Sequence, residues 1–129
     1  MNFILYIKCS EIQDFSYSNP FFEKLKMELP NSEFLDLDIF SGQELITMAI
    51  EGVRKAHKTF VLFDIISPNS TQKFIELVTY LADYPENKNV FINGNDQLIS
   101  KILFPSTNFC YHNESNKDIV AIINEKINS

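Results

Sequence analysis

Short apolar runs alternate with amphipathic stretches along the whole chain. Five runs have the length of a strand, and each is followed by a helical pattern; the runs span residues 3–9, 34–40, 59–66, 89–93 and 108–112. Within the third run, Phe60–Phe63 is apolar at every position, without the alternation of a half-exposed strand. Continuous apolar strands are typical of a parallel sheet that helices cover on both faces. The pattern therefore predicts an α/β fold.

The regular alternation also predicts how the strands connect. Right-handed crossovers between successive parallel strands give a three-layer, doubly wound five-stranded sheet of flavodoxin-like type, most simply with strand order 2-1-3-4-5. No linker, internal repeat or low-complexity segment interrupts the pattern. The 129 residues, 45% of them hydrophobic, are enough for one packed core. We therefore expect residues 1–129 to form a single domain.

Proline and hydroxyl side chains mark the expected helix boundaries. Pro20 suits the first position of a helix, and Pro30 ends that helix. Ser41 and Ser115 each precede an acidic residue by three positions, which is the spacing of a capping box. The helix after Ser41 is expected to turn one apolar stripe toward the sheet, made of Leu45, Ala49, Val53 and Ala56.

Acidic residues outnumber basic ones, and this narrows the partners to expect. The chain has 17 Asp and Glu against 11 Lys and Arg, which gives a net charge of -6. A field of this sign repels phosphate backbones and anionic lipid surfaces. We therefore expect neither nucleic acid nor a membrane as partner.

The N-terminal segment and the two cysteines indicate in which cellular compartment to expect the protein. The sequence enters its first apolar run at once, without a basic leader or a cleavage site, and no apolar run approaches the ~20 residues of a membrane span. Cys9 and Cys110 fall near the ends of the first and last runs, which suits neither a disulfide framework nor a metal motif. We interpret both as small buried side chains and expect a cytoplasmic protein.

The scarcity of glycine excludes two common nucleotide-binding motifs. The only glycines are Gly42, Gly52 and Gly94. A Walker loop and a G-x-G-x-x-G turn both need closely spaced glycines, so that backbone N–H groups can approach phosphate. His57 and His112 are not at the spacing of metal ligands either. We therefore expect neither motif, no metal ion and no bound cofactor.

Polar residues follow the expected strands at one edge of the sheet. Asp64 ends the third run, and Asn69, Ser70 and a helix that carries Glu76 come next. The first and second runs contribute further polar side chains to the same edge, namely Tyr6, Ser10 and Asp38. In an open parallel sheet, ligands bind at the carboxyl edge. We therefore expect a ligand site over the ends of the first three strands.

Two parts of the chain carry a resemblance to known families. The segment Asp38–Leu45, followed by Ala49–Ala56 and a hydrophobic strand, resembles TIR domains. The segment Phe63–Thr71, followed by Glu76, is similar to the strand, loop and helix of nucleoside 2-deoxyribosyltransferases. Both families have a site at the carboxyl edge of the sheet and use a glutamate on the helix after the third strand in N-glycosidic chemistry. Glu76 is the residue that matches this glutamate.

The resemblance implies a nucleotide- or nucleoside-binding domain that cleaves an N-glycosidic bond, with NAD or a nucleoside as substrate. Cleavage builds positive charge on the anomeric carbon, which a carboxylate such as that of Glu76 can stabilise or attack. The chemistry of the other polar residues suits the same substrate. We expect Tyr6 or Tyr17 to stack on the base, Asp38 and Asp64 to bind sugar hydroxyls, and Ser10 and Ser70 to form a polar rim. The amides that open the helix after Asn69 are expected to meet a phosphate.

A second hypothesis comes from another class of protein. The segment Phe63–Pro68 and the helix after it also resemble the phosphoacceptor region of a response-regulator receiver domain. Receivers bind magnesium through a pair of acids after the first strand, where this chain has Lys8–Ser10. The alternative is a non-catalytic signalling module, TIR-like or receiver-like, that binds a protein partner or forms a homo-oligomer. An exposed phenylalanine would favour this alternative.

Overall fold

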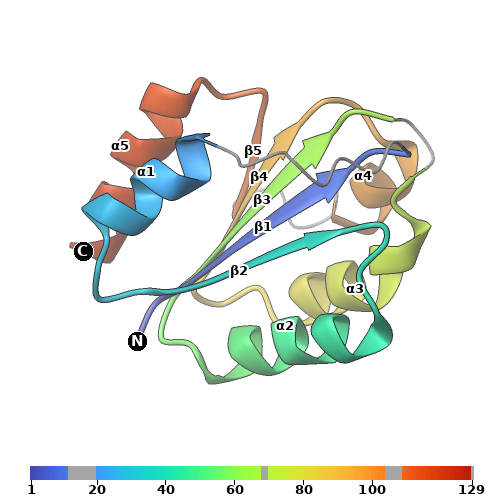
Figure 1. Cartoon of the computed structure of the whole chain (residues 1–129), viewed down its shortest axis with the longest axis horizontal. Coiled ribbons are helices and arrows are strands. Elements are labelled where there is room, and N and C mark those ends of the chain that lie inside the picture. The colour runs from blue at the N-terminus through green and yellow to red at the C-terminus, as the bar shows by residue number, and fades with distance from the viewer. Residues whose placement is uncertain (12–19, 68–69, 104–108, 129) are drawn as a thin grey trace.

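Five strands lie in one parallel sheet. The computed structural model describes residues 1–11, 20–67, 70–103 and 109–128 (Figure 1). The strands are β1 (Phe3–Cys9), β2 (Glu33–Asp38), β3 (Thr59–Ile65), β4 (Lys88–Asn93) and β5 (Cys110–His112). Their order is β2-β1-β3-β4-β5, and all neighbouring pairs are parallel. The structure thus confirms the predicted doubly wound α/β sheet of flavodoxin-like type.

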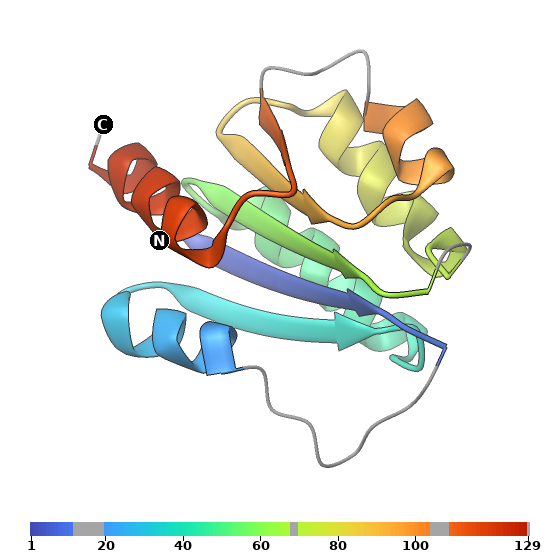
Figure 2. The same cartoon turned by 90° about the horizontal axis from the view of Figure 1, so that it is seen from above.

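Helices cover both faces of the sheet. On one face lie α1 (Pro20–Glu28) and α5 (Asn116–Ile127), and on the other lie α2 (Gln43–Lys55), α3 (Ile75–Asp83) and α4 (Gln97–Leu103) (Figure 1 and Figure 2). A short 3-10 helix, η1 (Gln72–Phe74), leads into α3. Within the described ranges, no helix is both long and apolar enough to cross a membrane.

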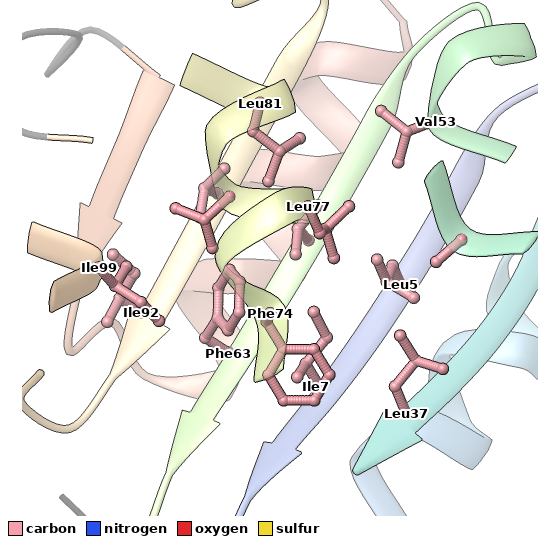
Figure 3. Close-up of a cluster of buried hydrophobic side chains, with 14 of the residues drawn as sticks. Leu5, Ile7, Leu37, Val53, Phe63, Phe74, Leu77, Leu81, Ile92 and Ile99 are labelled. Atoms are coloured by element: carbon pink, nitrogen blue, oxygen red, sulfur yellow. The ribbon is translucent and has the colours of Figure 1, made fainter. Parts of the chain in front are cut away.

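Alternate residues of each strand pack into two separate cores. Leu5 and Ile7 of β1 pack in the core beneath α2, α3 and α4 (Figure 3). Ile4 and Tyr6 pack in the core beneath α1 and α5. The buried helix side chains of this second core are Phe22, Leu25, Ile119 and Ile123. Because both faces of the sheet are covered, both sets of strand residues are buried, which accounts for the continuous apolar runs.

The helix boundaries follow the sequence signals at some positions only. Pro20 begins α1, and the hydroxyl of Ser115 caps α5 by accepting a hydrogen bond of 3.1 Å from a backbone amide of the first turn. The predicted cap by Ser41 is wrong, because Gly42 is the N-cap of α2 and makes no side-chain bond. The hydroxyl of Ser41 instead accepts a hydrogen bond of 3.0 Å from the amide of Asp38, so it closes the turn after β2.

The inward stripe of α2 also differs from the prediction at its first residue. Ala49 and Val53 are buried as predicted, whereas Leu45 is 37% exposed and Ile46 is only 1% exposed. Both positions lie about one helical turn before Ala49, so the spacing fits either residue. Packing against the sheet decides between them, and it selects Ile46.

A glycine brings the ends of β3 and β4 close together. Gly94 follows β4 with a φ of 98°, and its N–H donates a hydrogen bond of 3.0 Å to the side-chain oxygen of Asn113. A Cβ at Gly94 would lie 2.3 Å from the carbonyl oxygen of Ile65, the last residue of β3. Only glycine combines this φ with so close an approach of two backbones.

Both cysteines are free thiols. Burial at the end of β1 raises the pKa of Cys9 to about 12, and the carboxylates of Asp96 and Asp64 contribute to the rise. Burial also raises the pKa of Cys110 to about 11. Since only the thiolate is a good nucleophile, neither cysteine is placed for nucleophilic chemistry at neutral pH.

Candidate functional site

Four polar side chains form a row across the sheet near its carboxyl edge. Lys8 of β1 is in register with Asp38 of β2 and with Asp64 of β3, and Asp64 is in register with Asn93 of β4. The residue before each of them packs in the core beneath α2, α3 and α4. Because successive residues of a strand point to opposite faces, this polar row lies on the face of α1 and α5.

Asp64 is held in place by its two neighbours on the sheet. The hydroxyl of Tyr6 donates a hydrogen bond of 2.8 Å to one carboxylate oxygen, Oδ2. The side-chain amide of Asn93 donates to the other oxygen, Oδ1, at 3.4 Å. A carboxylate can accept about four hydrogen bonds, so Asp64 keeps capacity for a ligand. Of the predicted site residues, the structure thus brings Tyr6 and Asp64 together.

A cavity of about 350 Å³, called here the inner cavity, adjoins this pair. It lies among the ends of β1, β3 and β4 and the first turns of α1 and α5. The lining residues are Tyr6, Pro20, Phe21, Leu62, Phe63, Asp64, Phe91, Ile92, Asn93, Glu114, Asn116 and Ile119. Cavities of roughly 300–1,000 Å³ are the usual size for small-molecule ligands.

The inner cavity combines acceptor groups with apolar walls. Asp64, Asn93 and Glu114 supply carboxylate and amide oxygens, which bind hydroxyl or amino groups of a ligand. Phe21 and Phe91 supply apolar surface, and the ring of Phe91 is itself fixed by stacking on Tyr111 at a centroid distance of 4.9 Å. In the described part of the chain, no three His, Cys, Asp or Glu side chains gather as a metal site. The lining therefore suits a small, flat molecule with several hydrogen-bond donors.

Asp38 belongs to the polar row, but its carboxylate is engaged within its own turn. Its Oδ1 accepts a hydrogen bond of 2.8 Å from the amide of Phe40 and one of 3.4 Å from the hydroxyl of Ser41. This is the local pattern by which an aspartate stabilises a turn. Asp38 is not among the residues that line the inner cavity.

The predicted rim residues also lie outside the inner cavity. Ser10 and Ser70 are both buried, and the hydroxyl of Ser70 donates a hydrogen bond of 2.5 Å to the carbonyl of Ser67. Neither serine lines the inner cavity. Asn69 and Tyr17 fall outside the described residues, so their predicted roles stay predictions.

Glu76 lies in the first turn of α3, on the face of the sheet opposite the inner cavity. Its side chain is exposed, and it is not a lining residue. A carboxylate in the first turn also suits the helix dipole, whatever its function. The structure therefore does not bring Glu76 together with Tyr6 and Asp64, and its catalytic role stays a prediction.

Most of the lining residues were not among the predicted site residues, and three of them matter for the chemistry of the cavity: Asn93, Glu114 and Phe21. Asn93 ends β4 and Glu114 follows β5, so the carboxyl-edge rule that selected Asp64 could have found them. Phe21 carries no such signal, because an apolar residue at the start of an amphipathic helix is expected to be core. Its place beside a cavity depends on how α1 and α5 approach each other.

A buried polar contact stabilises the loops on the other face of the sheet. The hydroxyl of Thr71, at the start of η1, donates a hydrogen bond of 2.8 Å to Oδ2 of Asp96. The same oxygen accepts a bond of 2.8 Å from the amide of Ile99 in α4, as an N-cap does. This contact ties the loop after β3 to the loop after β4, and it supports the edge on which the inner cavity lies.

Comparison of the chain with known protein families, with curated proteins and with solved structures finds no match. The resemblance to TIR domains therefore rests on Asp38–Leu45 and Ala49–Ala56 alone, and that to nucleoside 2-deoxyribosyltransferases on Phe63–Thr71 and Glu76 alone.

Proposed function

We propose that this domain binds a nucleoside or nucleotide in the inner cavity. One observation carries the proposal: the carboxylate of Asp64 is fixed by Tyr6 and Asn93 at the side of an aromatic-walled cavity of about 350 Å³. A ribose presents hydroxyl donors that suit a fixed carboxylate, and a base presents a flat ring that suits Phe21 and Phe91. The location at the carboxyl edge of a parallel sheet is the usual one for such ligands.

Cleavage of an N-glycosidic bond would draw on the same carboxylates. Positive charge that develops on the anomeric carbon is stabilised by an acid within contact distance. In the inner cavity these acids are Asp64 and Glu114, whereas Glu76 lies on the opposite face. If the domain is an enzyme of this kind, we therefore expect Asp64 rather than Glu76 to face the sugar.

The binding test is a calorimetric titration with a panel of nucleosides and with NAD. We expect wild-type protein to bind at least one of them and Asp64→Asn to bind it about tenfold more weakly or worse, because a charge-assisted hydrogen bond is lost. Asp83→Asn, at the exposed end of α3, is the matched control and should bind as the wild type does.

The same samples are then followed for release of free base, with Glu76→Gln beside Asp64→Asn. Release that Asp64→Asn loses and Glu76→Gln keeps would support cleavage in the inner cavity. Release that only Glu76→Gln loses would place the chemistry on α3 instead. The binding proposal itself fails if no nucleoside or NAD binds, or if Asp64→Asn binds as tightly as the wild type.

A second candidate function, a protein-interaction module, is favoured by a different observation. Phe40, in the turn after β2, is 44% exposed, and Met48 of α2 is 57% exposed. Leu45 lies between them in the chain and is also exposed. If these residues join two copies of the chain, light scattering will detect a dimer that Phe40→Ser weakens. A monomer at all concentrations would contradict a homo-oligomer.

A further inference from the structure

A second hollow adjoins the inner cavity. This outer cavity, of about 370 Å³, lies between α1 and α5, and it is lined by Pro20, Phe21, Lys24, Asn116, Lys117 and Val120. It shares Pro20, Phe21 and Asn116 with the inner cavity. A ligand that fills the inner cavity can therefore extend past these shared residues into the outer one.

The two cavities differ in charge. The inner cavity is lined by two carboxylates, those of Asp64 and Glu114. The outer cavity is lined by two ammonium groups, those of Lys24 and Lys117, one from each of the facing helices. The outer cavity is thus lined by positive charge, although the chain as a whole has a net charge of -6. A ligand that fits both cavities has donor groups at one end and an anionic group at the other.

Both lysines can reach an anion at low cost. Lys24 pairs with Glu28 at 3.9 Å, and its side chain is 68% exposed. A solvated ion pair of this kind is weak, so an anion can replace it. Lys117 is exposed in the first turn of α5, where the hydroxyl of Ser115 caps the amide of Asp118. The first amides of a helix have no partner within it and favour negative charge nearby.

We infer that the ligand of this domain is phosphorylated, a nucleoside phosphate whose sugar hydroxyls meet Asp64 and whose phosphate lies in the outer cavity between Lys24 and Lys117. This inference rests on the proposed nucleoside-binding function and adds the anionic group and the orientation. The reverse orientation is less favourable, because it would place the phosphate against the carboxylates of Asp64 and Glu114. A ribose phosphate without a base shares the same chemistry and is separated from a nucleotide by experiment.

The test compares four ligands by calorimetry at low ionic strength: a nucleoside, its 5′-monophosphate, ribose 5-phosphate and inorganic phosphate. We expect the monophosphate to bind about tenfold more tightly than the nucleoside, since a phosphate adds charge-assisted hydrogen bonds. That advantage should shrink as salt is added, because the lysines are exposed.

The lysines are tested with a double variant, Lys24→Gln with Lys117→Gln. It should lose the advantage of the monophosphate and keep the wild-type affinity for the nucleoside. The control is Lys55→Gln with Lys101→Gln, which removes two exposed lysines from α2 and α4 on the opposite face. This control should behave as the wild type does.

The outcomes separate this inference from the proposed function. Equal affinity for nucleoside and monophosphate, or an advantage that survives in the double variant, overturns the inference and leaves nucleoside binding standing. Lysine-dependent binding of ribose 5-phosphate without any binding of nucleoside supports the anion site and contradicts the nucleoside function. Inorganic phosphate that binds as tightly as the monophosphate overturns the orientation. No binding of any of the four overturns both.

Discussion

Asp64 is both a residue that the sequence predicted for the site and a residue that lines the inner cavity. It is the one charged residue within the seven-residue strand β3, and a carboxylate beside a buried strand is unfavourable unless it is hydrogen-bonded. Tyr6 and Asn93 supply those bonds. The strand pattern fixed its position at the sheet edge in advance. For Glu76, the sequence pattern predicted that the residue lies on a helix. It did not predict on which face of the sheet that helix packs.

Gly94 is the residue on which the geometry of this edge depends most directly. We expect Gly94→Ala to lower the free energy of unfolding by at least about 2 kcal/mol, because alanine resists a positive φ and its Cβ would overlap the carbonyl oxygen of Ile65. Chemical denaturation measures the loss.

The control for this substitution is Gly42→Ala. Nothing lies within 4 Å of a Cβ at Gly42, which has an ordinary φ of -72° at the N-cap of α2. Its loss should stay within about 1 kcal/mol, the usual effect at such a cap. Equal losses in the two variants would contradict the close approach of the loops after β3 and β4.

At the scale of elements, the strands followed from the sequence more closely than the helix details did. Buried parallel strands leave an unbroken apolar run, and such a run has few other interpretations. Helix caps and stripes depend on competing local contacts instead. Ser41 bonds to the end of β2 rather than to α2, and Ile46 replaces Leu45 in the core. The sequence spacing is compatible with either arrangement at both positions, and tertiary packing determines which one forms.

The contact between Thr71 and Asp96 links two of these elements, and its strength can be measured. We expect Thr71→Val to lower the free energy of unfolding by about 1–3 kcal/mol, because a buried carboxylate oxygen loses a donor while the side-chain volume is kept.

Thr59→Val is the matched control for that substitution. Thr59 and Thr71 are both 1% exposed, but the hydroxyl of Thr59 finds no hydrogen-bond partner in the described structure. Removing an unsatisfied buried hydroxyl should leave the stability unchanged or raise it. If Thr59→Val proves the more damaging of the two, the contact between Thr71 and Asp96 does not stabilise the loops as argued.

At the scale of the whole molecule, the topology decides where a site can form. The strand order and right-handed crossovers place α1 and α5 together on one face, with their first turns at the carboxyl edge. The sequence predicted that edge, and with it Asp64. The sequence did not predict on which face of the sheet the site lies. The two cavities are formed where α1 and α5 face each other, and this packing is not visible in the sequence. Phe21, Lys24 and Lys117 therefore come to line these cavities only in the assembled fold.

The most direct test of this account is to map the ligand onto the chain by NMR, following backbone amide shifts as a nucleoside 5′-monophosphate is added. We expect the largest changes at Asp64, Asn93 and the first turns of α1 and α5, and no change in the amides around Glu76 on α3. Changes centred on α3, with α1 and α5 unaffected, would contradict it.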